Sequence, residues 1–216
     1  MNLIARIGAS LALLTLTACA SGTVGTGGVS SAPIFGSAPS AAWDTQPAGR
    51  QWTAVALAAI DRLAPQLSSV TPTDIDAFCP GYRNASPANR RAFYVSLLAE
   101  IAKYESNFDP TVRFTETAVD SRGQRIVSRG LLQLSQESAN GYGCAIASAE
   151  QLHDPTTNLE CGVRIVDRWL TRDQVVAGYA SGAWRGASRY WSVLRDREKL
   201  ADIQTALNAK PYCARR

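Results

Sequence analysis

The sequence has one histidine, His153, among its 216 residues, so metal sites built from several histidines are excluded. A Ser-His-Asp triad would need His153, and the Gly-x-Ser-x-Gly turn that often presents such a serine is absent. The chain also lacks a Cys-x-x-Cys pair, a P-loop and a Gly-x-Gly-x-x-Gly motif. These absences argue against a zinc ribbon and against nucleotide binding through either of these motifs. The sequence implies no metal or organic cofactor.

Charge is also scarce, because only 19% of the residues are charged and the formal net charge is +4. The basic residues are dispersed, so we expect no nucleic-acid binding. A mildly basic protein suits contact with an anionic polymer or a membrane surface. The hydrophobic content of 46% is enough for one ordinary domain with its own core.

The first 18 residues are typical of a secretory signal. Arg6 supplies the positive start, and the apolar run 7–16 is too short to span a membrane stably. The tetrapeptide Leu-Thr-Ala-Cys at 16–19 resembles a bacterial lipobox, which implies cleavage before Cys19 and lipidation of its thiol. The alternative is an ordinary signal with Cys19 as a plain thiol. Because Ala20 follows instead of aspartate, the resemblance implies the periplasmic face of the outer membrane.

Residues 19–49 are rich in Gly, Ser, Ala, Thr and Pro and almost uncharged, a composition typical of a flexible tether. We therefore expect a lipidated tether over 19–49 and a single folded domain over 50–216. Multiple acyl chains on Cys19 would anchor the protein stably, as a single chain would not.

The most informative segment is 86–110, which predicts a long helix. Ser86 is a good N-cap and Pro87 suits the first helical position. Apolar residues recur at helical spacing at Tyr94, Leu97, Leu98, Ile101 and Tyr104. Continued by one step, this stripe reaches Glu105, before Asn107 and Pro110 end the helix.

A carboxylate on an apolar stripe is desolvated, which raises its pKa, in known cases to about 6. Such a glutamate is a candidate general acid near neutral pH. The alternative is that Glu105 is an ordinary surface residue at a helix end, because periodicity places a side chain only to about one position.

Other segments give a coarse map of a mainly helical domain. We expect helices over 51–67 and 74–78, a short helix capped by Ser135, one helical turn at 148–152 and a strong helix from Asp154-Pro155. Two segments rich in Thr, Val, Ile and Phe, 112–119 and 124–128, flank a turn and predict a β-hairpin. Further helices are expected at about 173–179 and over 185–209.

Besides Cys19 there are four cysteines, and an even number in an exported protein predicts two disulfides. Three pairings are possible. We favour Cys144–Cys161, the shortest loop, which leaves Cys79–Cys213 to join the two ends of the domain.

Four motifs follow one another in a characteristic order: Glu105-Ser106, Gly130-Leu-Leu-Gln133, Asp154-Pro with Asn158-Leu and Gly162, and Gly178-Tyr-Ala-Ser-Gly182. Over about 86–190 this order resembles the catalytic domain of soluble lytic transglycosylases and goose-type lysozymes. The resemblance implies a mainly α, lysozyme-like (α+β) fold, a helical bundle with one small β-hairpin beside an active-site groove.

In that family the substrate is the peptidoglycan glycan strand and the reaction is that of a glycosidic-bond lyase. The resemblance implies that Glu105 protonates the leaving oxygen between N-acetylmuramic acid and N-acetylglucosamine. Glu105 then acts as base on the muramyl C6 hydroxyl, which closes a 1,6-anhydro ring without water. The substrate's own acetamido group supports the developing cation.

Ser106, Gln133 and Tyr179 are the expected substrate-binding residues. Their alternatives are a polar helix end for Ser106, a buried glutamine bonded to backbone for Gln133 and core packing for Tyr179. Leu132 stands where the family has Met, Leu134-Ser135 replaces a usual Met-Pro, and Ala180 stands where it has Asn.

Two other functions are compatible with the sequence. A hydrolytic muramidase needs a second carboxylate, for which Glu116 is the candidate. Asp109 and Asp120 are also nearby, and all three acids suit turns or an exposed hairpin. A non-catalytic cell-wall-binding lipoprotein is the other alternative, which Ala180 keeps open.

Overall fold

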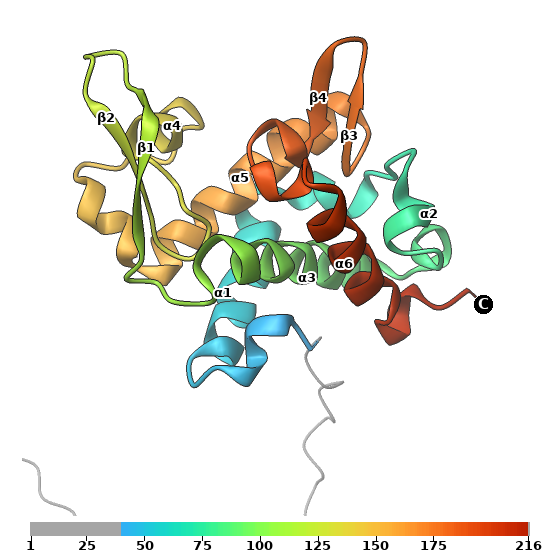
Figure 1. Ribbon diagram of the computed structural model, residues 1–216. Helices are drawn as coiled ribbons and strands as arrows, with labels where there is room; N and C mark the ends of the chain where they lie inside the picture. The colour runs from blue at the N-terminus through green and yellow to red at the C-terminus, as the bar shows by residue number, and fades with distance from the viewer. Residues whose placement is uncertain (1–39, 216) are drawn as a thin grey trace, which may run out of the picture. The chain divides into compact units, whose positions relative to one another are not determined.

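The computed structural model describes residues 40–215 (Figure 1). The expected signal segment, Cys19 and most of the expected tether lie outside these residues. The described part contains six helices and two antiparallel two-stranded sheets. The helices are α1 (Gly49–Leu63), α2 (Ile75–Phe78), α3 (Pro87–Ser106), α4 (Gln136–Gly141), α5 (Pro155–Asp173) and α6 (Arg197–Asn208). The strands are β1 (Arg113–Val119), β2 (Arg125–Arg129), β3 (Ala177–Ala180) and β4 (Ala183–Gly186), and short 3₁₀ turns connect the elements.

The prediction for α3 is confirmed at both ends. The Ser86 hydroxyl accepts a hydrogen bond from the Asn89 N–H, and Pro87 occupies the first turn. At the other end Asn107 adopts a left-handed conformation with φ of 50°, which stops the helix. Figure 1 shows α3 in the middle of the domain, with the other helices around it.

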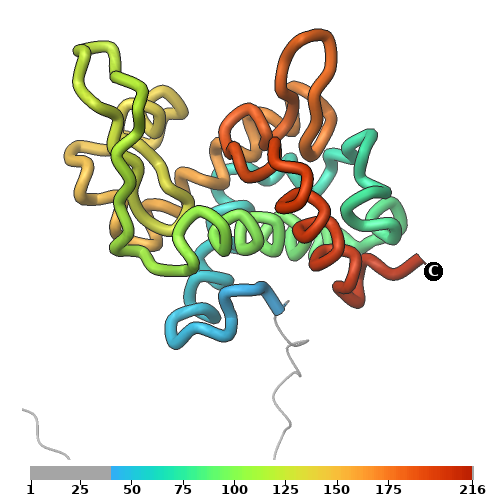
Figure 2. The backbone as a smooth tube through the Cα atoms, viewed as in Figure 1, coloured from blue at the N-terminus to red at the C-terminus, as the bar shows by residue number. Residues whose placement is uncertain are grey.

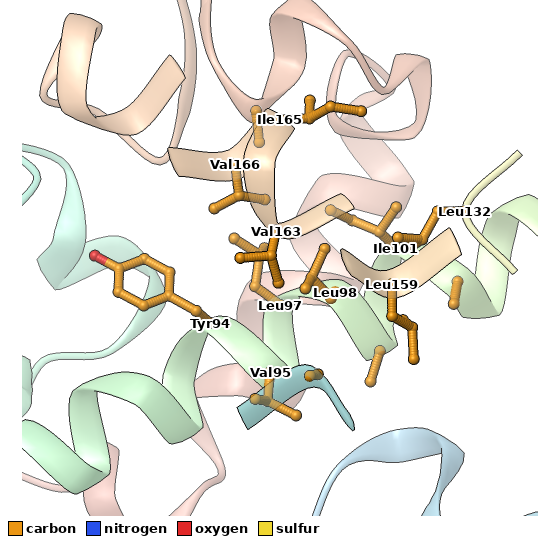
Figure 3. Close-up of a cluster of buried hydrophobic side chains, with 14 of the residues drawn as sticks. Tyr94, Val95, Leu97, Leu98, Ile101, Leu132, Leu159, Val163, Ile165 and Val166 are labelled. Atoms are coloured by element: carbon orange, nitrogen blue, oxygen red, sulfur yellow. The ribbon is translucent and has the colours of Figure 1, made fainter. Parts of the chain in front are cut away.

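Burial of α3 differs from the expected single stripe, because every residue from 92 to 102 is buried. A helix buried on all sides is typical of the centre of a core. Side chains of α3 and α5 meet there, as Figure 3 shows for Leu97, Leu98, Leu159 and Val163. The burial of Glu105 therefore follows from the central position of α3 and not from one apolar face.

Close packing between α5 and the segment before α4 depends on a glycine. A Cβ at Gly162 would lie 2.2 Å from the Leu132 Cδ1 atom. The missing side chain thus lets Leu132 pack directly onto α5, where it belongs to the hydrophobic core.

Part of the expected tether is folded. Residues 42–45 form a 3₁₀ turn, α1 begins at Gly49, and Trp43 is completely buried. The Trp43 indole N–H donates a 2.8 Å hydrogen bond to the Thr53 hydroxyl of α1. The packed part of the chain therefore includes 41–49, which composition alone assigned to the tether.

The first hairpin, β1–β2, is confirmed. The structure corrects the expectation of a single hairpin, since β3 and β4 form a second one where helices were expected near 173–179 and from 185. The turn residues Ser181 and Gly182 both have positive φ, 52° and 76°, which suits a two-residue hairpin turn. The expected long C-terminal helix begins only at Arg197.

Both disulfides form as favoured: Cys144 pairs with Cys161, and Cys79 with Cys213. The first joins the loop after α4 to α5, and the second joins the C-terminal end to the segment after α2. Figure 2 traces the backbone of these segments. Among the described residues, no helix has the length and apolar character required to cross a membrane.

Candidate active site

Glu105 lies in the last turn of α3 and is half-buried. Burial raises the pKa of its carboxyl to about 7, the negative charge of Glu116 adds to the rise, and Lys199 opposes it. A carboxyl group with this pKa carries a proton in a large share of molecules at neutral pH, as a general acid requires.

Three side chains outside α3 are electrostatically coupled to Glu105. Glu116 comes from β1, Lys199 from α6, and Tyr190 from the segment before α6. Burial raises the pKa of Tyr190, and the charge of Glu105 adds to this, which places the phenol in the surroundings of Glu105.

Glu116 sits in an irregular part of the hairpin, since the register of β1 and β2 shifts between Thr115 and Val119. Such irregularities redirect side chains and are common next to active sites. The Ser128 hydroxyl donates a 3.1 Å hydrogen bond to the Glu116 carboxylate and helps to hold it. The sequence identified Glu116 as a possible second carboxylate, and the structure brings it near Glu105.

The other two nearby acids belong to turns. Asp109 accepts hydrogen bonds from the N–H and hydroxyl of Thr111. Asp120 accepts bonds from the backbone N–H groups of Arg122 and Gln124 in the hairpin turn. Hydrogen bonds hold the pKa of both carboxyls below the usual value. These contacts agree with the turn interpretation.

Ser106 is buried and serves the scaffold. Its hydroxyl lies 3.1 Å from the Ala102 carbonyl and 2.9 Å from the Leu131 carbonyl, within donating distance of both. It therefore ties the end of α3 to the segment 130–133, next to Glu105. This geometry favours a positioning role over direct contact with a sugar.

Gln133 is also buried, and its amide nitrogen donates to the Val112 and Gly130 carbonyls at 3.1 and 2.9 Å. Within residues 40–215 its Oε1 atom is buried without a hydrogen-bond partner. The Gln133 amide therefore cannot bind a sugar acetamido group with its nitrogen and oxygen together, because its nitrogen already donates to two backbone carbonyls.

Asn158 holds the turn 130–133 in place. The sequence analysis missed this role, although Asn158 belongs to one of the four motifs. It is fully buried in the first turn of α5. Its Oδ1 accepts from the Leu132 N–H at 2.9 Å, and its Nδ2 donates to the carbonyls of Arg129 and Leu152 at 3.0 and 2.8 Å. Both the oxygen and the nitrogen of the Asn158 side-chain amide thus have hydrogen-bond partners, as buried polar groups usually do.

Gly130 is required at the start of this turn. Its φ is +75°, and a Cβ there would lie 2.1 Å from the Leu152 carbonyl oxygen and 2.4 Å from the Asn158 amide nitrogen. The turn can approach α5 so closely only with glycine at this position.

Tyr179 lies on β3 with 61% of its surface exposed, so core packing is excluded. Its ring contacts Trp184 of β4 edge to face, with 4.9 Å between centroids. Figure 1 shows the β3–β4 hairpin standing apart from the β1–β2 hairpin that carries Glu116. Tyr179 is thus free for a ligand, on a different element from the two glutamates.

The fold is that of a lysozyme-like protein, mainly α with small antiparallel sheets. The family description "Transglycosylase SLT domain" matches residues 84–199, which include the end of α3, the turn 130–133 and α5. The chain belongs to this family and is a lytic-transglycosylase-type enzyme that acts on peptidoglycan.

Three solved structures of one protein, DslA (Bd0314), are similar to this chain. The wild-type structure is 41% identical, covers 81% of this chain and 98% of its own, and has a TM-score of 0.78. Two others carry glutamine in place of a glutamate, at position 143 or 154 of DslA, with the same identity and TM-score and 97% of their own length covered. The comparison with curated proteins finds no match.

Proposed function

We propose that Glu105 is the general acid that cleaves the bond between N-acetylmuramic acid and N-acetylglucosamine. The observation that carries the proposal is a half-buried carboxyl with a pKa of about 7 at the end of the central helix. Protonated Glu105 would donate its proton to the leaving glycosidic oxygen, as general acids do in glycoside cleavage.

The family supports a lytic transglycosylase as the first candidate for the full reaction. The carboxylate left on Glu105 would accept the proton of the muramyl C6 hydroxyl, whose oxygen attacks C1. A 1,6-anhydro ring closes, Glu105 regains its proton, and water takes no part. One carboxyl group is sufficient for this cycle.

Hydrolysis is a second candidate, which the position of Glu116 favours. Its charge raises the pKa of Glu105, so the two carboxyls are electrostatically coupled. Glycoside hydrolases use such a pair, with the second carboxylate as base or nucleophile. The positions replaced in the two DslA variants differ by 11, as do 105 and 116. This equal spacing supports a joint role for Glu105 and Glu116.

Mass spectrometry of the soluble products from sacculi separates the candidates. We would compare the wild-type domain, Glu105→Gln and Glu116→Gln. Glu160→Gln, which removes a partly exposed carboxylate paired with Arg62, is the control. Anhydro-muramyl ends that vanish in Glu105→Gln and persist in Glu116→Gln support the transglycosylase. Reducing ends that vanish in both variants support the hydrolase.

Full activity of Glu105→Gln would contradict the proposed role of Glu105. Binding to sacculi without soluble products from the wild-type domain would instead identify a non-catalytic wall-binding protein, the alternative associated with Ala180.

We also propose, from the segment 1–19 alone, that the protein is anchored by lipid on Cys19 to the periplasmic face of the outer membrane. Detergent phase partitioning of the exported protein, with Cys19→Ser as the comparison, tests this. Equal partitioning of both forms into the aqueous phase would contradict it.

A further inference from the structure

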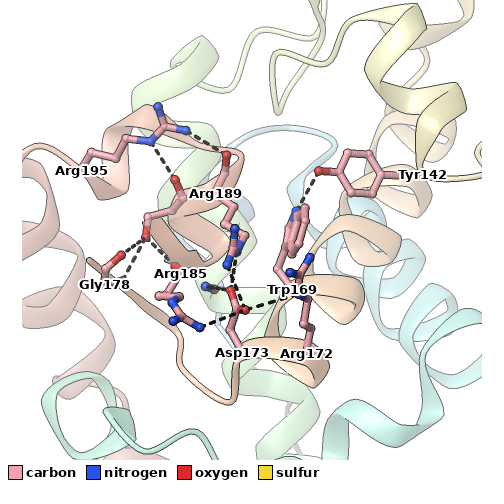
Figure 4. Close-up of polar contacts among 10 residues, drawn as sticks. Tyr142, Trp169, Arg172, Asp173, Gly178, Arg185, Arg189 and Arg195 are labelled. Carbon is pink, nitrogen blue, oxygen red and sulfur yellow. Dashed lines mark hydrogen bonds and ion pairs between the residues drawn. The ribbon is translucent and has the colours of Figure 1, made fainter. Parts of the chain in front are cut away.

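Three arginines surround one indole near the end of α5. The guanidinium carbons of Arg168, Arg172 and Arg189 lie 5.7, 5.3 and 4.8 Å from the ring centroid of Trp169. Arg168 and Arg172 are exposed, and Arg189 is partly exposed. Figure 4 shows Arg172 and Arg189 beside Trp169.

Negative charge in this cluster is limited to one carboxylate. Asp173 accepts hydrogen bonds from the Arg189 Nε at 2.6 Å and the Gly186 N–H at 2.8 Å. Arg172 and a fourth arginine, Arg185, lie 3.8 Å from it. Burial alone would raise the pKa of Asp173, but these partners outweigh it and hold the pKa below the usual value.

The nearby acid Asp167 forms no ion pair with these arginines in residues 40–215. Its carboxylate accepts from the Gln66 amide and the Thr171 hydroxyl. Within the described residues, Arg168 has no ion-pair partner. Like charges four residues apart on a helix, such as Arg168 and Arg172, repel each other. The cluster therefore carries several positive charges for one carboxylate, an arrangement that a bound anion would stabilise.

The aromatic side chains connect this cluster to the surroundings of Glu105. The Trp169 indole N–H donates a 2.8 Å hydrogen bond to the Tyr142 hydroxyl. The Tyr142 ring contacts the Tyr190 ring with 5.7 Å between centroids. Tyr190 in turn lies near enough to Glu105 to feel its charge. The contacts between Trp169, Tyr142 and Tyr190 thus link the arginines to the surroundings of Glu105.

We propose that Arg168 and Arg172, beside Trp169, form a binding site for the carboxylates of the peptide stems of peptidoglycan, while Arg189 stays paired with Asp173. The inference rests on the proposed function, because the stems hang from the glycan strand that Glu105 would cleave. Guanidinium groups bind carboxylates through paired hydrogen bonds, and their stacking on Trp169 orients them in advance. The site selects strands that carry peptides over strands that do not.

Binding measurements in the Glu105→Gln background test the site without relying on turnover. The ligands are soluble glycan fragments with their peptide stems and the same fragments after the stems have been removed by an amidase. The test variant is Arg168→Gln/Arg172→Gln. The control, Arg50→Gln/Arg215→Gln, removes the same charge from two exposed arginines elsewhere in the domain.

We expect the test variant to lose about tenfold or more in affinity for peptide-bearing fragments, as when one side of a charge pair is truncated. Affinity for peptide-free fragments should change less than about twofold, as for surface changes away from a ligand. The control should leave both affinities unchanged. Arg168→Lys/Arg172→Lys keeps the positive charges but not the paired N–H groups of the guanidinium. It should therefore bind peptide-bearing fragments more tightly than the glutamine variant and less tightly than the parent.

The proposal would be overturned if the test variant lost affinity equally for both kinds of fragment or lost none for either. It would also be overturned if the Glu105→Gln parent did not bind peptide-bearing fragments. Loss of binding to anionic phospholipid vesicles with unchanged affinity for peptide-bearing fragments would also overturn it and assign the arginines to a membrane surface. Cleavage of peptide-free glycan by the test variant with Glu105 intact reports separately on the proposed function.

Discussion

The carboxylate of Glu116, on β1, lies near enough to Glu105, at the end of α3, for its charge to raise the Glu105 pKa. Lys199 of α6 acts on the same group in the opposite sense. The proton on Glu105 is thus controlled by burial and by two charges from separate elements. Each charge can be removed on its own.

The pH dependence of cleavage should follow the Glu105 proton. Because the acid must be protonated, we expect kcat/KM to fall as the pH rises through about 7. Glu116→Gln removes a negative charge and should move this alkaline limb to lower pH. Lys199→Met removes a positive charge and should move it to higher pH. Profiles of kcat/KM for the three proteins test the two signs, and shifts in the same direction would contradict the assignment.

Replacing Glu105 should stabilise the protein above neutral pH. The folded state raises the Glu105 pKa from an ordinary 4.5 to about 7. The unfolded chain therefore loses this proton at lower pH, and the stability of the wild type falls as the pH rises through that interval. We expect Glu105→Gln to be more stable by about 3 kcal/mol at pH 8 and nearly equal at pH 4. Urea unfolding at both pH values measures this, and equal stabilities at pH 8 would show that the carboxyl is not desolvated.

Asn158→Ala should damage both stability and activity. It removes the side chain that bonds to Leu132, Arg129 and Leu152. The buried Leu132 N–H and Leu152 carbonyl lose their partner, whereas the Arg129 carbonyl keeps its bond from the Leu134 N–H. We expect a loss of about 3 kcal/mol, with lower activity because the turn 130–133 is no longer held against α5. Thermal unfolding and cleavage of sacculi provide the measurements. Asn140→Ala, in the short helix α4, is a comparison for an exposed residue whose amide has its own backbone partners. A neutral Asn158→Ala would show that the turn is held by other contacts.

The two disulfides should contribute unequally to stability. Cys79 and Cys213 are 134 residues apart, whereas Cys144 and Cys161 are 17 apart. Longer closed loops lose more entropy when cross-linked, so replacing the cysteine pairs by serine should cost about 4–5 and about 3 kcal/mol respectively. Denaturant unfolding of each double variant gives the comparison. The reverse order would mean that local packing, and not loop closure, determines the effect.

Tyr179→Ala should affect binding and not folding. The ring is largely exposed, so we expect a stability change within about 0.5 kcal/mol. If the tyrosine contacts the glycan, as the family motif implies, KM for sacculi should rise while the melting temperature stays constant. Phe114→Ala, another largely exposed aromatic side chain, is the matched control. Equal effects of the two variants on KM would argue against a specific role for Tyr179.

Local signals in the sequence were sufficient for much of this fold. Ser86, Pro87 and Asn107 determined the ends of α3, and the Thr-, Val- and Ile-rich segments determined β1 and β2. Both disulfides followed from counting cysteines and preferring the shortest loop. These features depend mainly on neighbouring residues, which the sequence displays directly.

The errors occurred where distant contacts decide the structure. The segment 177–186 has few strand-forming residues, yet it forms a hairpin. Two hydrogen bonds hold it, one from the Gly178 N–H to the Ser188 hydroxyl and one from the Gly186 N–H to the Asp173 carboxylate. Trp43 folds an otherwise tether-like segment because its indole reaches Thr53. Likewise, Glu116 is held by Ser128 of the neighbouring strand, and Asn158 bonds to Arg129 and Leu132 of an earlier segment, contacts that no periodicity shows.

The first described residue, Ser40, contacts the segment that follows α6. The ammonium group of Lys210 donates a 2.8 Å hydrogen bond to the carbonyl of Ser40. Figures 1 and 2 show this entry point on the side of α3 opposite to the two projecting hairpins. Attaching the protein to a solid support at this entry point therefore leaves the hairpins facing outward, so immobilised enzyme should digest wall fragments supplied in solution.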